Sequence, residues 1–175
     1  MATKVLSNEF MQRLAIEGAW KELSRDFSWS EAMLEKYQDK VDWSKISKNM
    51  HIQWTIQMIQ KFCKRIKWDD FSYYAGESIL VDSFLDAFKD QWNWSYLSHN
   101  YNLHLTYELL DKYAEYWDWE EIIRYYSHSN IFQGRGIEFY ERYKKYIPES
   151  KLKDSALWDE IVSQEKRNII EELIS

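Results

Sequence analysis

Apolar side chains recur along this chain at intervals of about 25 residues, and five tryptophans mark the interval most clearly. They are separated by 23, 25, 26 and 25 residues and are here termed the anchor tryptophans: Trp20, Trp43, Trp68, Trp94 and Trp119. Regular spacing of this length is typical of stacked units of secondary structure. It predicts a tandem array in which each anchor tryptophan holds an equivalent place.

Other residue types recur at fixed sequence distances from the anchors. Three residues after each anchor there is an apolar side chain: Leu23, Ile46, Phe71, Leu97 and Ile122. The next residue is a serine in four of the five cases: Ser24, Ser47, Ser72 and Ser98. Before each anchor, apolar residues lie ten, nine, six and two positions away, apart from Gly18. Such offsets fall on one face of an α-helix and on both faces of a β-strand.

Capping residues mark where these helices begin. Thirteen residues before the anchors stand Ser7, Ser30, Thr55, Val81 and Thr106. Four of the five have a side-chain oxygen that can accept a bond from an N–H of the first turn. An apolar residue precedes each one, at the spacing of a hydrophobic staple. The pattern predicts helices over about 8–18, 31–41, 56–66, 82–92 and 107–117, with a short second helix beginning at each anchor.

Each unit is therefore predicted to be two short helices that are stable only when stacked on their neighbours. The chain is predicted to be all-α, an α-solenoid of about five to six two-helix repeats with a period of about 25 residues. We expect one domain over 1–175, with repeats over about 7–20, 20–43, 43–68, 68–94, 94–119 and 119–148. A C-terminal cap over 149–175 follows, because the next anchor position is Glu149, directly after Pro148.

Two segments carry a family resemblance. They are Trp92-Asn93-Trp94-Ser95-Tyr96-Leu97-Ser98-His99-Asn100 and Trp117-Asp118-Trp119. They resemble the WDWxxLSxN repeats that occur in tandem in uncharacterised giant-virus and bacterial proteins. The resemblance extends over about residues 8–123, although Val41 and Ile66 replace the first tryptophan and Ile123 replaces the serine. The resemblance implies a helical repeat array, but it implies no particular activity, because the family has no defined one.

The composition argues against several classes of fold and function. Four glycines and one proline are too few for a turn-rich β fold. The net charge of −6 disfavours a nucleic-acid partner, whose surface usually needs a basic stripe. No apolar run is long enough for a membrane span, and the single cysteine, Cys63, excludes an intramolecular disulfide. We expect a cytoplasmic protein that does not bind membranes.

Residues able to carry chemistry do not form a recognisable constellation. The four histidines lack the spacing of a metal-binding helix, and Cys63 has no predicted histidine partner. Gly134-Arg135-Gly136 lacks the lysine of a phosphate-binding loop. The sequence therefore nominates no catalytic residue, no cofactor and no metal site, and we expect that the chain is not an enzyme.

Tyrosines supply the candidate binding residues. They follow successive anchors by five to seven positions, in or beside the predicted loops: Tyr73, Tyr74, Tyr101, Tyr125 and Tyr126. In a solenoid these positions line up along one edge, which is the usual binding face of a repeat array. Either the rings pack between repeats or they are exposed for a partner. A basic face around Lys61 and an acidic run around Asp111 are either solvated or form a bipolar docking surface.

These observations favour a non-enzymatic adaptor that binds a protein along the tyrosine edge. The alternative is a small acidic inhibitor or immunity protein that blocks a specific toxin or nuclease. Genomic context discriminates the two, because an inhibitor gene is expected beside its target. An enzyme would instead require a pocket with convergent polar side chains.

Overall fold

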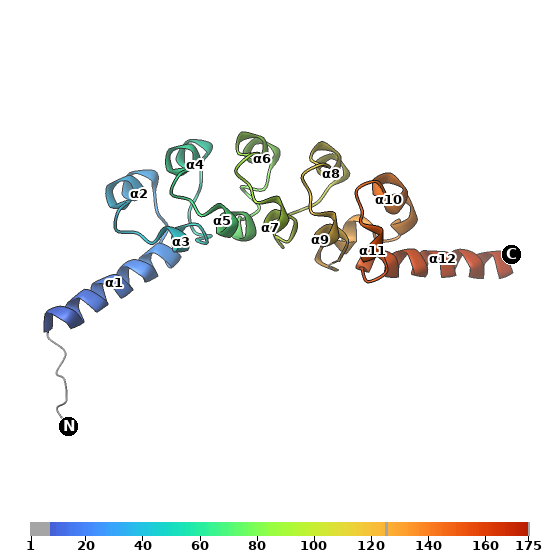
Figure 1. Cartoon of the computed structure of the whole chain (residues 1–175), viewed down its shortest axis with the longest axis horizontal. Coiled ribbons are helices and arrows are strands. Elements are labelled where there is room, and N and C mark those ends of the chain that lie inside the picture. Colours follow the sequence, from blue (N-terminus) through green and yellow to red (C-terminus); the bar gives the residue numbers. More distant parts are fainter. Residues whose placement is uncertain (1–7, 125, 175) are drawn as a thin grey trace, which may run out of the picture.

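The computed structural model describes residues 8–124 and 126–174, and within these ranges the regular structure is helical, with no β-strand. The prediction of an all-α chain is confirmed. Figure 1 shows the helices as an arch of two rows, here called the upper row and the lower row, with one longer helix extending from each end.

The chain alternates between the two rows. The upper row consists of α2 (Glu31–Tyr37), α4 (Ile56–Phe62), α6 (Asp82–Ala87), α8 (Tyr107–Lys112) and α10 (Gly136–Tyr143). The lower row consists of α3 (Trp43–Ile46), α5 (Trp68–Tyr74), α7 (Trp94–Ser98), α9 (Trp119–Arg124) and α11 (Glu149–Leu152). The end helices are α1 (Asn8–Asp26) and α12 (Ala156–Ile174), and a 3-10 helix, η1 (Tyr126–Ile131), follows α9. The helices α3, α5, α7 and α9 each begin at an anchor tryptophan, as predicted.

Side-chain oxygens cap three upper-row helices in the predicted way. Ser30, Thr55 and Thr106 each accept a hydrogen bond from the backbone N–H three residues later, at 3.4, 3.1 and 3.2 Å. Val81 has no such oxygen, and α6 begins without a side-chain cap. The apolar residues that precede these four positions are all buried. Local signals thus mark the beginning of three of the upper-row helices, α2, α4 and α8.

The upper-row helices end earlier than predicted, at residues 37, 62, 87 and 112. The reason is a tight bend before each anchor, in which the residue two positions before the anchor is buried: Val41, Ile66, Trp92 and Trp117. After the bend, the indole N–H of the anchor donates to the carbonyl five residues earlier, at 2.8–3.1 Å, for Trp43, Trp68, Trp94 and Trp119. This bond satisfies a carbonyl group that the end of the helix leaves unpaired.

The serine four residues after an anchor connects one lower-row segment to the next. The hydroxyls of Ser24, Ser47 and Ser98 donate to the carbonyl of their own anchor at 2.6–2.7 Å. The same oxygens, and that of Ser72, accept a bond from the backbone N–H just before the following anchor, at 2.9–3.0 Å. All four serines are buried. A small hydroxyl suits this position because it donates and accepts at once.

Other buried side chains make the reverse connection, to the preceding lower-row segment. Asn49 and Asn100 each donate to the carbonyl of the serine in that segment at 2.9 Å. The Ser98 carbonyl lies 3.0 Å from Nε2 of His128, which must donate because a carbonyl only accepts. His128 is 2% exposed. Burial holds the pKa of its imidazole below the ordinary value, and the nearby His99 lowers it further.

The buried His128 predicts a pH dependence of stability. Its folded-state pKa lies below the unfolded value of about 6.5, so the unfolded chain binds this proton more readily. The stabilising contribution is complete above about pH 6.5 and is lost as the pH falls toward the folded pKa. His128→Gln keeps a donor for the Ser98 carbonyl but does not titrate. In urea denaturation between about pH 7.5 and pH 5.5, we expect wild type to lose more stability than this variant. Equal losses would contradict the assignment.

Ion pairs link successive upper-row helices. A basic residue near the end of one helix reaches acidic residues of the helix before it, and the pairs are Lys61 with Glu31 and Glu35, Lys112 with Asp82 and Asp86, and Arg142 with Asp111. Tyr113 and Tyr143 add hydroxyl bonds to Asp86 and Asp111, at 2.7 and 2.9 Å. The basic face around Lys61 and the acidic run around Asp111 therefore take part in helix packing. Exposed pairs contribute little energy, and their main effect is on register.

The N-terminal helix departs from the prediction. α1 runs unbroken from Asn8 to Asp26, through the expected end near residue 18. Ala19 stands where an aspartate or asparagine caps α3 and α7, and alanine favours an uninterrupted helix. Three apolar residues of α1 that are in register with core residues of the later units are exposed, with Met11 at 50%, Leu14 at 47% and Leu23 at 41%. The register does not bury them, because no described segment covers them.

At the other end, α12 packs against α10 and α9. A Cβ on Gly136, the first residue of α10, would lie 3.0 Å from the backbone nitrogen of Ile161, so a larger residue would require α10 and α12 to move slightly apart. Gln164 of α12 accepts a bond from the Ile137 N–H at 3.1 Å and so serves the first turn of α10. Among the described residues, no helix is both long enough and apolar enough to cross a membrane.

Candidate protein-binding edge

Three of the five candidate tyrosines lie in the described part of the molecule with their side chains. Tyr73 and Tyr74 are the last residues of α5, and Tyr101 lies in the loop after α7. Tyr101 is 61% exposed, whereas Tyr73 and Tyr74 are half-buried. Tyr125 and the side chain of Tyr126 lie outside the described residues.

Tyr73 is the centre of an aromatic cluster. Its ring stacks on the imidazole of His99 with 5.4 Å between centroids, and it meets Tyr74 edge-on at 4.8 Å. Tyr96, which is 45% exposed, lies 6.2 Å away. Tyr73 and His99 each follow their anchors by five residues, so side-by-side packing of α5 and α7 brings them together. Aromatic ring pairs of this kind are each worth about 0.5–1.5 kcal/mol beyond burial.

Tyr101 extends the cluster over the loops. Its hydroxyl lies 4.0 Å from Sδ of Met50, although the two residues are 51 positions apart. Both follow their anchors by seven residues, and Ala75, the equivalent residue of the intervening segment, is small and buried. Met50 is 53% exposed. Sequence reasoning missed Met50, although its register, identical to that of Tyr101, could have identified it.

Charged groups border the aromatic cluster. Nζ of Lys48 lies 5.5 Å from the centre of the Tyr74 ring and 3.0 Å from a carboxylate oxygen of Asp70. On the other side, Nδ1 of His99 lies 2.9 Å from Oε2 of Glu121. Exposed aromatic and methionine side chains are thus surrounded by polar groups of both signs. We call Lys48, Met50, Tyr73, Tyr74, Tyr96, His99 and Tyr101 the aromatic edge.

The aromatic edge is a surface rather than a pocket. The hollow beside Met50, Tyr74 and Gly76 has a volume of about 30 Å³, which is the space of one water molecule. A larger depression of about 490 Å³, near Ser44 and Trp68, is open to solvent. Small-molecule sites usually enclose about 300–1,000 Å³. Neither of these two hollows is an enclosed cavity of that size.

The described residues contain no group of three or more His, Cys, Asp or Glu side chains arranged to hold a metal ion. Cys63 is a free thiol whose Sγ lies 3.8 Å from the amide oxygen of Gln91. No family model, curated protein or solved structure matches this chain.

Proposed function

We propose that this chain is a non-enzymatic adaptor that binds a protein partner along the aromatic edge. The observation that carries the proposal is the exposed pair Tyr101 and Met50, which lies beside the ring cluster around Tyr73. Tyrosine and methionine are enriched in protein interfaces, and rigid aromatic side chains often dominate affinity there. Held rings lose little conformational entropy on binding. Tyr125 and Tyr126 belong to the proposal by register alone.

The scaffold is proposed to be an α-solenoid with a period of about 25 residues, related to the WDWxxLSxN repeats. Four lower-row helices that begin at anchor tryptophans support this architecture. So do the serine and indole hydrogen bonds, which recur at the same offsets from the anchors. Stacked units of this kind present equivalent loop residues along one edge, which is where such arrays bind.

The test uses the 175-residue chain as bait in extracts of its native source, with captured proteins identified by mass spectrometry. A captured partner is then purified, and its dissociation constant is measured for wild type and for a Tyr74→Ser, Tyr101→Ser variant. We expect binding to weaken about a hundredfold, because two interface rings are lost at about 1–2 kcal/mol each.

The matched control is Tyr116→Ser. Tyr116 is 38% exposed, packs on Trp94 from the bend after α8, and is not part of the aromatic edge. This variant should bind like wild type, and circular dichroism should show unchanged helix content in both variants. If the double variant binds the partner as tightly as wild type does, the proposal is contradicted.

A further inference from the structure

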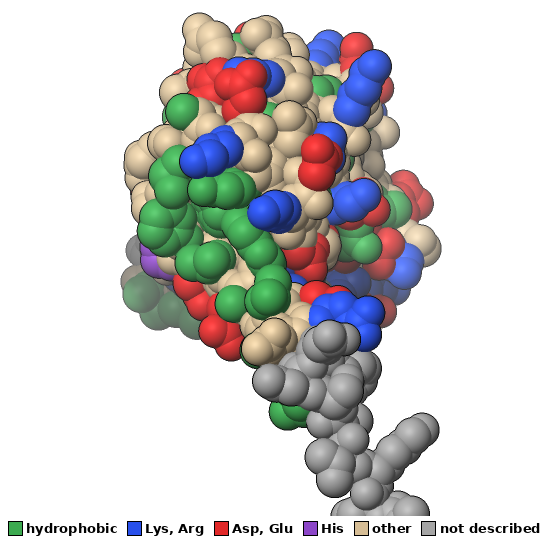
Figure 2. Space-filling model, turned by 90° about the vertical axis from the view of Figure 1, so that its left-hand side faces the viewer, with side chains coloured by type: hydrophobic (Ala, Val, Ile, Leu, Met, Phe, Trp, Pro, Cys, Tyr) green, Lys and Arg blue, Asp and Glu red, His purple; other side chains and the backbone are tan. Residues whose placement is uncertain are grey.

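The exposed large hydrophobic side chains are concentrated at the two ends of the molecule. Of the fourteen such side chains that the structure describes, nine lie on α1, directly after it, or on the last turns of α12. Figure 1 shows these helices extending from opposite ends of the arch. Figure 2, which faces the α1 end, shows hydrophobic side chains gathered in a continuous band on that surface. Patches of this kind mark interaction sites on soluble proteins.

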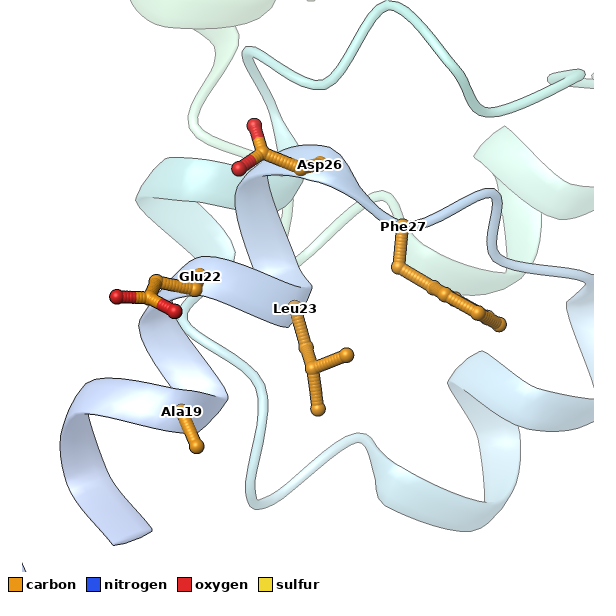
Figure 3. Close-up of a pocket in the computed structure, with 5 residues that line it drawn as sticks. All are labelled: Ala19, Glu22, Leu23, Asp26 and Phe27. Atoms are coloured by element: carbon orange, nitrogen blue, oxygen red, sulfur yellow. The ribbon is translucent and has the colours of Figure 1, made fainter. Parts of the chain in front are cut away.

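The α1 end contains a hollow of about 460 Å³ lined by Ala19, Glu22, Leu23, Asp26 and Phe27. Leu23 and Phe27 are 41% and 39% exposed. In Figure 3 the side chains of Ala19, Leu23 and Phe27 point to one side of the helix end, and the carboxylates of Glu22 and Asp26 point away from them. We call this surface the α1 hollow. It combines an apolar floor with an acidic border.

The interior of the molecule indicates what fits such a surface. The residues equivalent to Leu23, three positions after the other anchors, are at most 1% exposed: Ile46, Phe71, Leu97 and Ile122. The residues equivalent to Glu22 include Asp70 and Glu121, which pair with Lys48 and His99, just after the ends of α3 and α7, at 3.0 and 2.9 Å. Inside the array this face therefore receives a helical segment followed by a basic side chain. The α1 hollow has the same chemistry and no described segment over it.

The C-terminal half of α12 has the complementary face. Lys166, Ile169, Ile170 and Leu173 are spaced i, i+3, i+4 and i+7, so they lie on one side of the helix. All four are exposed, Leu173 to 80%. By the same spacing, the acidic residues Glu165, Glu171 and Glu172 fall outside this stripe. We call it the α12 stripe. It is apolar, with one basic residue.

We propose that a second copy of this chain covers the α1 hollow with its α12 stripe. In this contact the aliphatic side chains of the stripe pack on Leu23 and Phe27, and Lys166 approaches Glu22 and Asp26, as Lys48 approaches Asp70 within the array. The two surfaces are different and lie at opposite ends, so the contact is head-to-tail and extends to further copies. A contact of about two helical turns is small, and association is therefore weak and concentration-dependent.

Sedimentation velocity of the 175-residue chain from about 5 to about 500 µM tests this proposal. The mean mass of wild type should rise beyond that of a dimer with concentration. Leu23→Asp and Leu173→Asp, which each place a carboxylate on one of the two surfaces, should each remain monomeric. The matched control is Leu14→Asp, because Leu14 is 47% exposed on the same helix but on another side of it. It should associate like wild type. A thermal melt of each variant establishes that it is folded.

Mixing the two variants gives the sharpest outcome. Leu23→Asp keeps an intact α12 stripe, and Leu173→Asp keeps an intact α1 hollow. The mixture should form one-to-one dimers that do not grow further. Several results would overturn the proposal: wild type that is monomeric at about 500 µM, a mixture that stays monomeric, or Leu173→Asp that still associates. The last result would point to contact between two α1 helices.

Discussion

Replacing Trp119 with alanine is expected to lower the free energy of unfolding by about 3–5 kcal/mol, as for other buried aromatic truncations. Trp119 is 5% exposed. Its ring stacks on Tyr146 at 5.4 Å and lies 4.7 Å from Tyr143, so it joins α9 to α10 and the turn that follows α10. Its indole N–H donates to the Ala114 carbonyl at 2.8 Å. The substitution therefore removes packing and a buried hydrogen bond together.

Trp119→Phe separates the two contributions. Phenylalanine keeps much of the apolar contact but leaves the Ala114 carbonyl without its donor, which costs about 1–3 kcal/mol for a buried group. The matched control is Trp20→Phe. Trp20 is also an anchor, yet the carbonyl five residues earlier lies inside α1, where the helix itself supplies a donor. Urea denaturation should show a smaller loss for Trp20→Phe. Equal losses would mean that the indole bond does not hold the bend.

Much of the helical framework was predictable because its signals are local. A cap such as Thr55 depends only on the turn that it begins, and α4 starts where the cap predicts. The anchor positions were predictable for a similar reason, since the lower-row helices open at them. The residues at which the upper-row helices end were not predictable from the sequence. They depend on the hydrogen bond from each anchor tryptophan to a carbonyl in the bend. A periodic apolar pattern continues through that bend and does not reveal it.

The first helix differs from the later units at the residue before its anchor. Ala19 lacks the capping oxygen that Asp42 and Asn93 have and is a strong helix former, whereas Lys67 shows that a lower-row helix can also begin without a side-chain cap. Leu14 and Leu23 are exposed because no described segment lies over them. A register of apolar positions identifies equivalent residues, but burial also requires a neighbour on each side.

The aromatic edge was predictable in position but not in detail. The register placed Tyr73, Tyr74 and Tyr101 near one another, and the structure joins them through His99 and Met50. The half-burial of Tyr73 and Tyr74 depends on what the adjacent segments contribute, for which a single sequence offers no rule. Long-range partners such as Met50 appear only when the loops of alternate segments are placed side by side.

Leu97 is the second position at which we expect a substitution to lower the stability of the fold strongly. Leu97→Ala is expected to lower the free energy of unfolding by about 2–5 kcal/mol, the usual cost of truncating a fully buried leucine. Leu97 is 0% exposed and lies in α7, between α5 and α9. Removal of the side chain leaves a cavity in the middle of the lower row. Because each segment is stable only through its neighbours, that cavity weakens the contacts on both sides.

Leu23→Ala is the matched control, because Leu23 holds the same position relative to its anchor and is 41% exposed. We expect it to cost about 1 kcal/mol or less, since little of the side chain is removed from contact. Both variants are compared with wild type by urea denaturation at low protein concentration, where head-to-tail contacts at the α1 hollow do not contribute. A Leu97→Ala midpoint equal to that of wild type would show that the register is wrong. Equal costs at the two positions would instead show that Leu23 is covered in the isolated chain, because an exposed leucine has little packing to lose.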